Sequence, residues 1–302
     1  MNPTVRPRRS RRPTLLIVGC GDVGLRVARL LRGRWRLLAL TSTPARRETL
    51  RDAGIVPLAG DLDRPETLGR LAGLADAVLH LAPPAASGGT DLRTARLIQA
   101  LARSPRLARL VYASTSGVYG DCGGARVDET RRLSPTTDRA RRRADAEARL
   151  RRYGRSAGVA VTLLRIPGIY ALDRPGGDPR ERLRRGTPVL AAADDVHTNH
   201  IHADDLARAC VAALQRGMPQ RAVNVSDDSE LKMGEYFDLA ADLHGLPRPP
   251  RLARAEAAAA LSPMQMSFLG ESRRLVNRRL KEELGVVLHH ETVMKGLRAS
   301  PD

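Results

Sequence analysis

Three glycines directly after a short apolar segment constrain the fold of this 302-residue chain more than any other sequence feature. Residues 14–19 read TLLIVG, which predicts a buried parallel strand because aliphatic side chains follow one another without a polar break. Residues 22–31 then carry apolar side chains at helical spacing. The turn between this strand and this helix has the pattern G-x-G-x-x-G, formed by Gly19, Gly21 and Gly24.

Each glycine of this turn has a separate physical role. The first permits a tight turn, the second lets a diphosphate approach the backbone, and the third lets the helix pack closely on the strand. The helix start adds free N–H groups and a positive dipole end, which bind phosphate. The alternative is an ordinary glycine turn. We expect a dinucleotide site whose contact residues are Gly19, Gly21, Asp22, Val23 and Gly24.

The order of the predicted elements indicates a parallel sheet. Strand and helix alternate without hairpin signals, which is typical of an α/β fold with a Rossmann-type doubly wound sheet. Strands are expected at 14–19, 36–41, 55–59, 77–81 and 109–114, and helices at 22–31, 44–53, 65–74 and 91–102. Later elements are a charged helix at 137–152, a strand at 159–165, and helices at 253–261 and 272–284.

These elements divide the chain into three parts. Residues 1–13 are expected to form a basic disordered tail, and residues 14–165 the Rossmann core. Residues 166–302 are expected to form mainly a small C-terminal α/β lobe, with the part around 198–226 returning to the core.

The end of the second strand bears on which dinucleotide binds. A carboxylate at this point would bind the ribose 2′-hydroxyl of NAD. Here the strand ends in Thr41 and Ser42 without an acid, and Arg46 and Arg47 follow. Arginine offers bidentate hydrogen bonds to a 2′-phosphate, so the sequence favours NADP and leaves NAD as the alternative. The competing interpretation places both arginines in water at a helix start.

Two later strand ends contain further candidates for coenzyme contacts. Asp61 and Leu62 follow the third strand, where a carboxylate could meet the adenine amino group. Leu81, Ala82 and Pro83 follow the fourth strand, where small residues could line a ribose. Taken alone, each segment is typical of an ordinary loop.

The charge and the cysteines bear on partners and compartment. The formal net charge is +18, but the arginines are spread over every segment, which predicts a solvated surface rather than a specific nucleic-acid site. Nucleic-acid binding is the weaker alternative, with steep salt dependence as its signature. Cys20, Cys122 and Cys210 form no ligand pattern, which indicates reduced thiols in the cytoplasm. No apolar run approaches the ~20 residues of a membrane span, so no membrane partner is expected.

Four separate segments together indicate a family. Residues 111–120 read VYASTSGVYG, a Ser/Thr-rich strand end that closes in Val-Tyr-Gly. Residues 164–170 (LRIPGIY), 199–207 (NHIHADDLA) and 224–226 (NVS) agree with it. As a set they resemble the extended short-chain dehydrogenase/reductase family, also called the NAD-dependent epimerase/dehydratase family. The resemblance covers nearly the whole chain and implies a Rossmann core with a small C-terminal substrate lobe.

The resemblance also implies roles for single residues. Thr115 would be the catalytic Ser/Thr, whose hydroxyl hydrogen-bonds a substrate oxygen, and Tyr119 would lie in the substrate cleft. Pro167 would lie beside the coenzyme. The alternatives are a strand-end threonine bonded to backbone and a packing tyrosine with a solvated hydroxyl.

The family's Tyr-x-x-x-Lys pair is missing from this chain. In the family the tyrosine is the proton donor or base, and the lysine holds the nicotinamide ribose. Those two positions fall on Arg139 and Arg143, and an arginine stays protonated near neutral pH and cannot be a general base. Arg143 could still hold a ribose, and Arg139 could bind an anionic substrate group. A solvated basic helix face explains both equally well.

Three histidines, His197, His200 and His202, lie close to Asp204. The resemblance makes this segment a strand-to-helix junction in which Asp204 caps the helix, so no metal site is expected.

Two functional hypotheses of different classes follow. The first is an NAD(P)-dependent oxidoreductase or epimerase acting on a small sugar or sugar-nucleotide-like substrate, or on another anionic small molecule. The second is an NADP-binding sensor or regulatory protein without turnover, favoured by the loss of both tyrosine and lysine. Members of the family often dimerise through two helices, so a homodimer that uses the helix at 139–152 stays a hypothesis.

Overall fold

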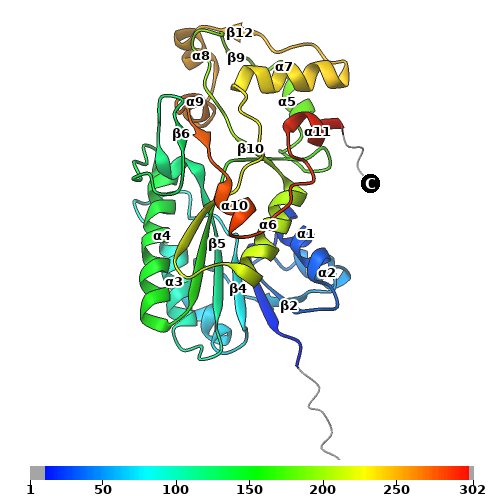
Figure 1. Cartoon of the computed structure of the whole chain (residues 1–302). Coiled ribbons are helices and arrows are strands. Elements are labelled where there is room, and N and C mark those ends of the chain that lie inside the picture. The colour runs from blue at the N-terminus through cyan, green and yellow to red at the C-terminus, as the bar shows by residue number, and fades with distance from the viewer. Residues whose placement is uncertain (1–10, 299–302) are drawn as a thin grey trace, which may run out of the picture.

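A computed structural model of the chain describes residues 11–298, so most of the expected basic tail lies outside the described residues. Seven parallel strands form the central sheet in the order β11-β7-β5-β4-β1-β2-β3 (Figure 1). Because the strand order runs outward on both sides of β1, the sheet is doubly wound, as the sequence predicted. The strands are β1 Thr14–Val18, β2 Arg36–Thr41, β3 Val56–Ala59, β4 Ala77–His80, β5 Arg109–Thr115, β7 Ala160–Ile166 and β11 Arg221–Asn224.

Helices cover both faces of this sheet, because the side chains of each strand alternate between two apolar cores. Leu15 and Ile17 of β1 belong to one core, whereas Leu16 and Val18 belong to the other. The first core is covered by α1 Asp22–Leu31, α2 Arg46–Asp52 and α6 Ala203–Arg216. The second is covered by the 3₁₀ helix η1 Pro65–Leu71 and by α3 Leu92–Leu101 and α4 Asp138–Ala157. No helix within residues 11–298 is long and apolar enough to cross a membrane.

A smaller lobe lies above the carboxyl ends of the strands (Figure 1). It has its own apolar core, in which Tyr170, Leu190 and Phe237 are buried. Its last helix packs on this core through Gly296, where an added Cβ would lie 2.2 Å from the Tyr170 hydroxyl. The remaining elements after β5 are η2 Ser116–Tyr119, β6 Arg126–Val127, β8 Gly168–Tyr170, α5 Pro179–Arg184, β9 Val189–Leu190, β10 His200–His202, α7 Met233–His244, β12 Arg251–Leu252, α8 Arg254–Ala260, α9 Pro263–Leu269, β13 Arg274–Leu275, α10 Arg278–Glu282 and α11 Val293–Arg298.

The expected helix at 272–284 is wrong in its first half. There the chain forms the short strand β13, which pairs in parallel with β6, and only α10 is helical. The Asn199 side chain holds the strand from both sides: it donates to the Arg273 carbonyl at 2.9 Å and accepts from the Leu275 N–H at 2.8 Å. A tertiary contact therefore overrides the local helical pattern.

Candidate functional site

A cleft of about 640 Å³ lies where the carboxyl ends of the strands meet the lobe. It runs from the glycine turn after β1, past the ends of β5 and β7, to α9 and the segment before β10. Parallel strands end at one edge of a sheet, so residues distant in sequence meet there. Of the residues that the sequence singled out, those lining the cleft are Gly19, Gly21, Asp22, Val23, Gly24, Leu81, Thr115, Arg139, Arg143 and Pro167, together with His197 and His200.

The glycine turn has room for a ligand at its middle position. Gly19 has a φ of +84°, and a Cβ there would lie 2.4 Å from the Ala82 backbone nitrogen. A Cβ on Gly24 would lie 3.1 Å from the Cys20 sulfur, so the helix lies close to the strand. A Cβ on Gly21 would instead meet nothing within 4 Å. Gly21 is also the N-cap of α1, whose first N–H groups have no partner inside the helix.

A buried arginine organises the side chains around this turn. Arg26 of α1 has a side chain only 3% exposed, and its guanidinium donates to Asp22 at 3.1 Å and to Asp173 and Asp204 at 2.6 Å each. Although burial opposes it, the hydrogen bonds that Arg26 donates to Asp204 and Asp173 raise the pKa of Arg26. One cation therefore joins α1 to the loop after β8 and to the start of α6. No sequence pattern predicts this cluster, because its acids are far apart along the chain.

Arg46 lies beside the glycine turn, at the start of α2. Its Nη2 donates to the Cys20 carbonyl at 2.8 Å, which places a guanidinium near the carboxyl end of β2. Thr41 ends that strand, and its hydroxyl accepts from the Thr43 N–H at 3.2 Å. In Rossmann folds this strand end faces the adenosine ribose.

Several predicted coenzyme contacts do not line the cleft: Thr41, Ser42, Arg46, Asp61, Leu62, Ala82 and Pro83. The Asp61 carboxylate accepts from the Asp63 N–H at 2.9 Å and so shapes its own turn. The Ala82 N–H donates to the Val18 carbonyl at 2.9 Å. Coenzyme contacts by these residues stay predictions.

Thr115 ends β5 and faces the cleft. It is the N-cap of η2, and its hydroxyl accepts from the Gly117 N–H at 3.2 Å. The local backbone bond that the sequence offered as an alternative is therefore present. A hydroxyl that accepts one hydrogen bond can still donate its own hydrogen to a ligand.

The two arginines in the Tyr-x-x-x-Lys positions differ in their surroundings. Arg143 donates to the Ala113 carbonyl and, at 3.3 Å, to the Tyr112 hydroxyl. The guanidinium of Arg139 lies 4.6 Å from the centre of the Phe268 ring and, among residues 11–298, has no hydrogen-bonding or ionic partner. Desolvation and then the charge of Arg143 lower the pKa of Arg139. The charge of Glu271 opposes this lowering, but within residues 11–298 no carboxylate forms an ion pair with either arginine.

Tyr119 does not reach the cleft, contrary to the prediction for the substrate site. It is 1% exposed, and its hydroxyl donates to Asn224 Oδ1 at 2.7 Å and accepts from Arg165 at 2.9 Å. Burial raises its pKa to about 12, against the opposing charge of Arg165. The hydroxyl is neither solvated nor available to a ligand, because η2 turns the ring into the core.

A buried ion pair lies next to the cleft and was not anticipated. Arg165 and Glu147 have side chains 4% and 2% exposed, and they are joined at 2.8 Å. Ser114, which lines the cleft, donates to the same carboxylate at 2.6 Å. An arginine inside the apolar strand LLRI was the available signal, since a buried charge requires a partner.

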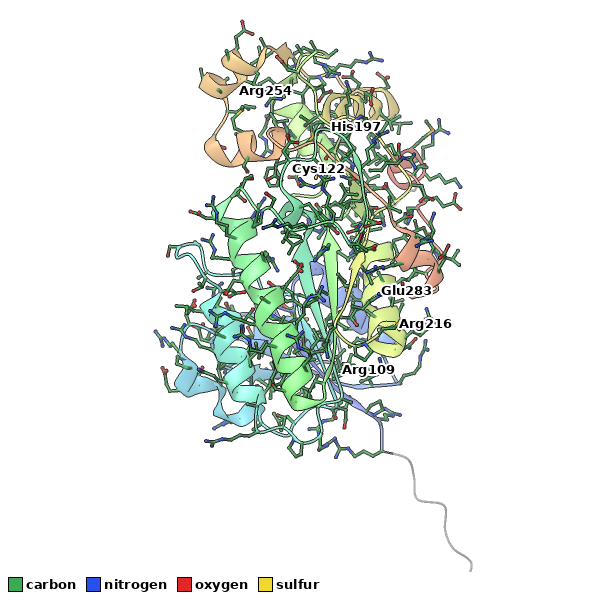
Figure 2. All side chains as sticks on the ribbon, turned by 60° about the vertical axis from the view of Figure 1, so that its left-hand side comes forward. Arg109, Cys122, His197, Arg216, Arg254 and Glu283 are labelled. Carbon is green, nitrogen blue, oxygen red and sulfur yellow. The ribbon has the colours of Figure 1, made fainter. Side chains whose placement is uncertain are left out.

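The lobe side of the cleft is polar. Glu271 accepts from the Thr136 hydroxyl at 2.6 Å and from Arg273 at 2.7 Å, so its charge is matched. His200 is buried and stacks on Tyr236 at a centroid distance of 4.0 Å. Burial lowers the pKa of His200 to about 3, which keeps the ring neutral. His197 lies near the junction of the lobe and the sheet (Figure 2).

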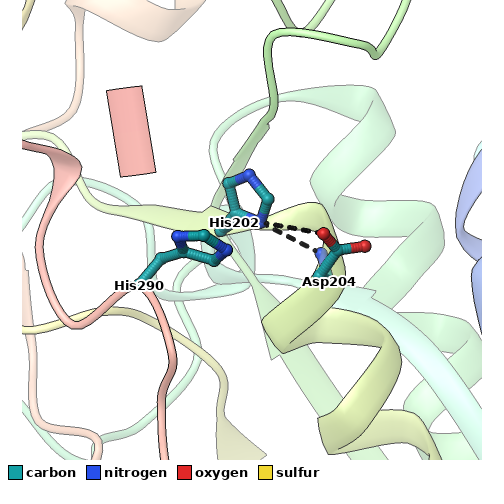
Figure 3. A group of neighbouring side chains, drawn as sticks. All are labelled: His202, Asp204 and His290. Carbon is teal, nitrogen blue, oxygen red and sulfur yellow. Dashed lines mark hydrogen bonds and ion pairs between the residues drawn. The ribbon is translucent and has the colours of Figure 1, made fainter. Parts of the chain in front are cut away.

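His202, Asp204 and His290 each offer one ligand atom within 4.8 Å of the others (Figure 3). Two of the three groups already have protein partners, namely the His202 ring and the Asp204 carboxylate. His202 Nδ1 accepts from the Asp204 N–H at 3.3 Å, so His202 and not Asp204 is the N-cap of α6. The expected cap is wrong because the Asp204 carboxylate turns to Arg26 instead. A guanidinium on the carboxylate of this group disfavours a second cation there.

A family model identifies the family of this chain, and one curated relative matches most of its length. The family model described as "NAD dependent epimerase/dehydratase family" matches residues 15–226. Protein YeeZ of Escherichia coli K12 is 28% identical over 246 residues, which cover 77% of this chain and 84% of YeeZ.

Solved structures resemble nearly the whole chain. A functionally unknown conserved protein from Silicibacter pomeroyi is 32% identical, with a TM-score of 0.79 over 94% of this chain and 96% of that one. UDP-glucuronic acid 4-epimerase from Bacillus cereus, solved with UDP-glucuronic acid and NAD, is 18% identical, with a TM-score of 0.74 over 95% and 97%. UDP-glucose 4-epimerase from Thermotoga maritima, solved with UDP-glucose, is 19% identical, with a TM-score of 0.76 over 94% and 96%. At these identities the two epimerases show the fold alone.

Proposed function

Because the chain belongs to the NAD dependent epimerase/dehydratase family, we propose that it is an NAD(P)-dependent oxidoreductase or epimerase that acts on a small, anionic, sugar-like substrate. One observation carries the proposal. A single cleft joins the open helix start at Gly21 to the hydroxyl of Thr115 and to the unneutralised guanidinium of Arg139. A phosphate site, a polar group for a reacting oxygen and a cation for an anionic group thus share one space.

The glycine turn fits the diphosphate of a dinucleotide. The space beside Gly21 and the unpaired N–H groups of α1 match a phosphate in shape and in charge. Arg143 lies farther along the cleft and would hold the nicotinamide ribose by hydrogen bonds. Arg46 beside the turn supports NADP over NAD, because its guanidinium can bind a 2′-phosphate. When bound, the coenzyme supplies hydride transfer at its nicotinamide ring.

The chain's own residues would bind and orient the substrate. The Thr115 hydroxyl would donate to the reacting oxygen while it keeps its bond from the Gly117 N–H. Arg139 would hold an anionic group of the substrate, since among the described residues its guanidinium contacts the Phe268 ring but makes no hydrogen bond or ion pair. It would also stabilise negative charge on a nearby oxygen, but it would not act as a base.

Coenzyme-dependent turnover of anionic sugars and sugar nucleotides tests this proposal. We expect Thr115→Ala to lower kcat by about 100-fold, which is typical for removal of one hydrogen-bond donor to a reacting oxygen. Thr130→Ala is the matched control, because the Thr130 hydroxyl also bonds locally, to Asp128, but does not line the cleft. Equal turnover by the two variants would exclude the role of Thr115. Tighter binding of NAD than of NADP would exclude the coenzyme preference alone.

A second candidate function is a dinucleotide-binding sensor without turnover. The observation that favours it is the absence of tyrosine and lysine from the described residues that line the cleft. Such a protein would bind the coenzyme and change its affinity for a partner protein, with no change in nicotinamide absorbance. Turnover of any substrate above a no-enzyme control would remove this candidate.

A further inference from the structure

Arg174 holds an unassigned position beside the glycine turn. It belongs to the loop at 171–178 between β8 and α5, and both Arg174 and Gly176 line the cleft. Its Nε lies 3.2 Å from Asp22 Oδ2, and its side chain is 24% exposed. Among residues 11–298, its two terminal nitrogens bind no carboxylate or carbonyl, and they are not among the buried unpaired atoms. The terminal nitrogens therefore keep their hydrogen-bonding capacity on a side chain that lines the cleft, whereas Nε, although 3.2 Å from Asp22 Oδ2, is buried and makes no hydrogen bond within the described chain.

The loop holds this side chain in place. Asp173, the preceding residue, accepts from the buried Arg26 at 2.6 Å, which fastens the loop to α1. The Gly177 N–H donates to the Arg174 carbonyl at 2.9 Å, which closes a tight turn. A Cβ on Gly177 would lie 3.0 Å from Arg174 Nη1, so the side chain packs against the turn. Arg174 is thus directed toward α1 before any ligand arrives.

Asp22 explains why a cation is needed here. An aspartate in the first turn of α1 interacts favourably with the helix dipole, but it repels a phosphate that binds the same N–H groups. Arg26 and Arg174 both face this carboxylate. Arg26 is already committed to Asp173 and Asp204 as well, whereas Arg174 still has both terminal nitrogens available.

We propose that Arg174 binds the diphosphate of the dinucleotide from the lobe side, so that the ligand is held between the glycine turn and the loop at 171–178. This rests on the proposed function, since it takes a dinucleotide as the ligand. A guanidinium forms bidentate, charge-assisted hydrogen bonds with phosphate oxygens. Arg174 is therefore a binding residue of the coenzyme site and not only a counter-ion of Asp22.

Ligands that contain different parts of the coenzyme test this assignment. We would measure the Kd of NADP, of ADP-ribose, which has the diphosphate but no nicotinamide, and of adenosine 2′-phosphate, which has no diphosphate. Arg174→Gln should raise the Kd of NADP and of ADP-ribose by about tenfold or more, and should change the Kd of adenosine 2′-phosphate by less than about twofold. Arg174→Lys should fall between wild type and Arg174→Gln, because it keeps the charge and loses the fork. Arg29→Gln is the control, since it removes an exposed arginine from α1 away from the cleft.

The outcomes separate the two proposals. If wild type binds NADP and ADP-ribose, and folded Arg174→Gln binds both as tightly as Arg29→Gln does, the assignment of Arg174 is wrong and the proposed function stands. If Arg174→Lys matches wild type for ADP-ribose, a positive charge suffices at this position and the bidentate contact with the diphosphate is wrong. If wild type binds neither NADP, NAD nor ADP-ribose, the proposed function and the assignment fail together.

Discussion

A buried charged side chain in the middle of helix α4 has a partner of opposite charge, whereas the two arginines that line the cleft at one end of this helix have none within the described chain. In the middle, Glu147 is buried and meets Arg165 and Ser114 at hydrogen-bond distance. At the cleft end, Arg139 and Arg143 lie one turn apart, and neither binds a carboxylate of the described chain. Like charges at this spacing are unfavourable in a helix, and they become more so when partly desolvated.

The difference separates structural charge from charge that is available to a ligand. A buried ion pair such as Glu147–Arg165 holds strand and helix together, and neither of its charges is available to bind a ligand. An unmatched pair of cations in a cleft is stabilised when an anion enters. The same residue type thus has two roles, and the surroundings of the side chain decide which one applies.

The largest expected effect breaks the matched half of the comparison. Arg165→Met leaves Glu147 charged and buried without its partner, so we expect the free energy of unfolding to fall by about 3–5 kcal/mol. Urea unfolding followed by circular dichroism measures it. Arg141→Met, which breaks the exposed pair with Asp138, should cost less than about 1 kcal/mol. Equal losses for the two variants would contradict the comparison.

A second prediction concerns two buried histidines outside α4, which test how burial acts on a charge that has no buried counter-ion. Burial lowers the pKa of both His80 and His200 to about 3, from an ordinary value near 6.5. The unfolded chain therefore binds protons that the folded chain rejects. Above about pH 6.5, neither histidine makes the free energy of unfolding depend on pH. As the pH falls from there toward about 3, each histidine lowers the free energy of unfolding by about 1.4 kcal/mol per pH unit.

Urea midpoints between pH 7 and pH 5 measure this slope, which should be smaller in His200→Phe. Phenylalanine keeps the stacking on Tyr236 and removes one titrating group. An unchanged slope would show that His200 is accessible to protons in the folded protein.

The smallest expected effect on stability concerns the cleft end of α4, where Arg139 and Arg143 have no carboxylate partner among the described residues. Arg139→Met should change the free energy of unfolding by no more than about 1 kcal/mol, because it removes the contact with the Phe268 ring but no hydrogen bond or ion pair with a described residue. Its affinity for an anionic substrate, measured with coenzyme bound, should fall about tenfold. Arg142→Met on the same helix should have the opposite effect. It removes hydrogen bonds to the Gly88 and Ala86 carbonyls, so the free energy of unfolding should fall by about 1–3 kcal/mol, while the affinity for the anionic substrate should not change. If both variants lose only stability, the cleft end holds no ligand cation.

The sheet could be predicted from the sequence because its signals are local. The strand and helix around Gly21 depend on apolar spacing and on glycine, and both read directly from neighbouring residues. The fate of Tyr119 depends instead on Asn224 and Arg165, which are distant in the chain. Similarly, His202 rather than Asp204 caps α6 because Arg26 arrives from α1 to bind the aspartate. The site predictions failed at residues whose position depends on contacts with distant segments, and such contacts cannot be read from a single sequence.

The contact between the last helix and Tyr170 has a genetic consequence. Gly296 leaves space for the Tyr170 ring, and Tyr170 packs edge-on against His200, which lines the cleft. A nonsense or frameshift mutation just before Thr292 would spare every cleft-lining residue yet remove the support behind one wall. Alleles of that kind would be scored as mild by their position in the reading frame, and we expect them to behave as loss-of-function alleles.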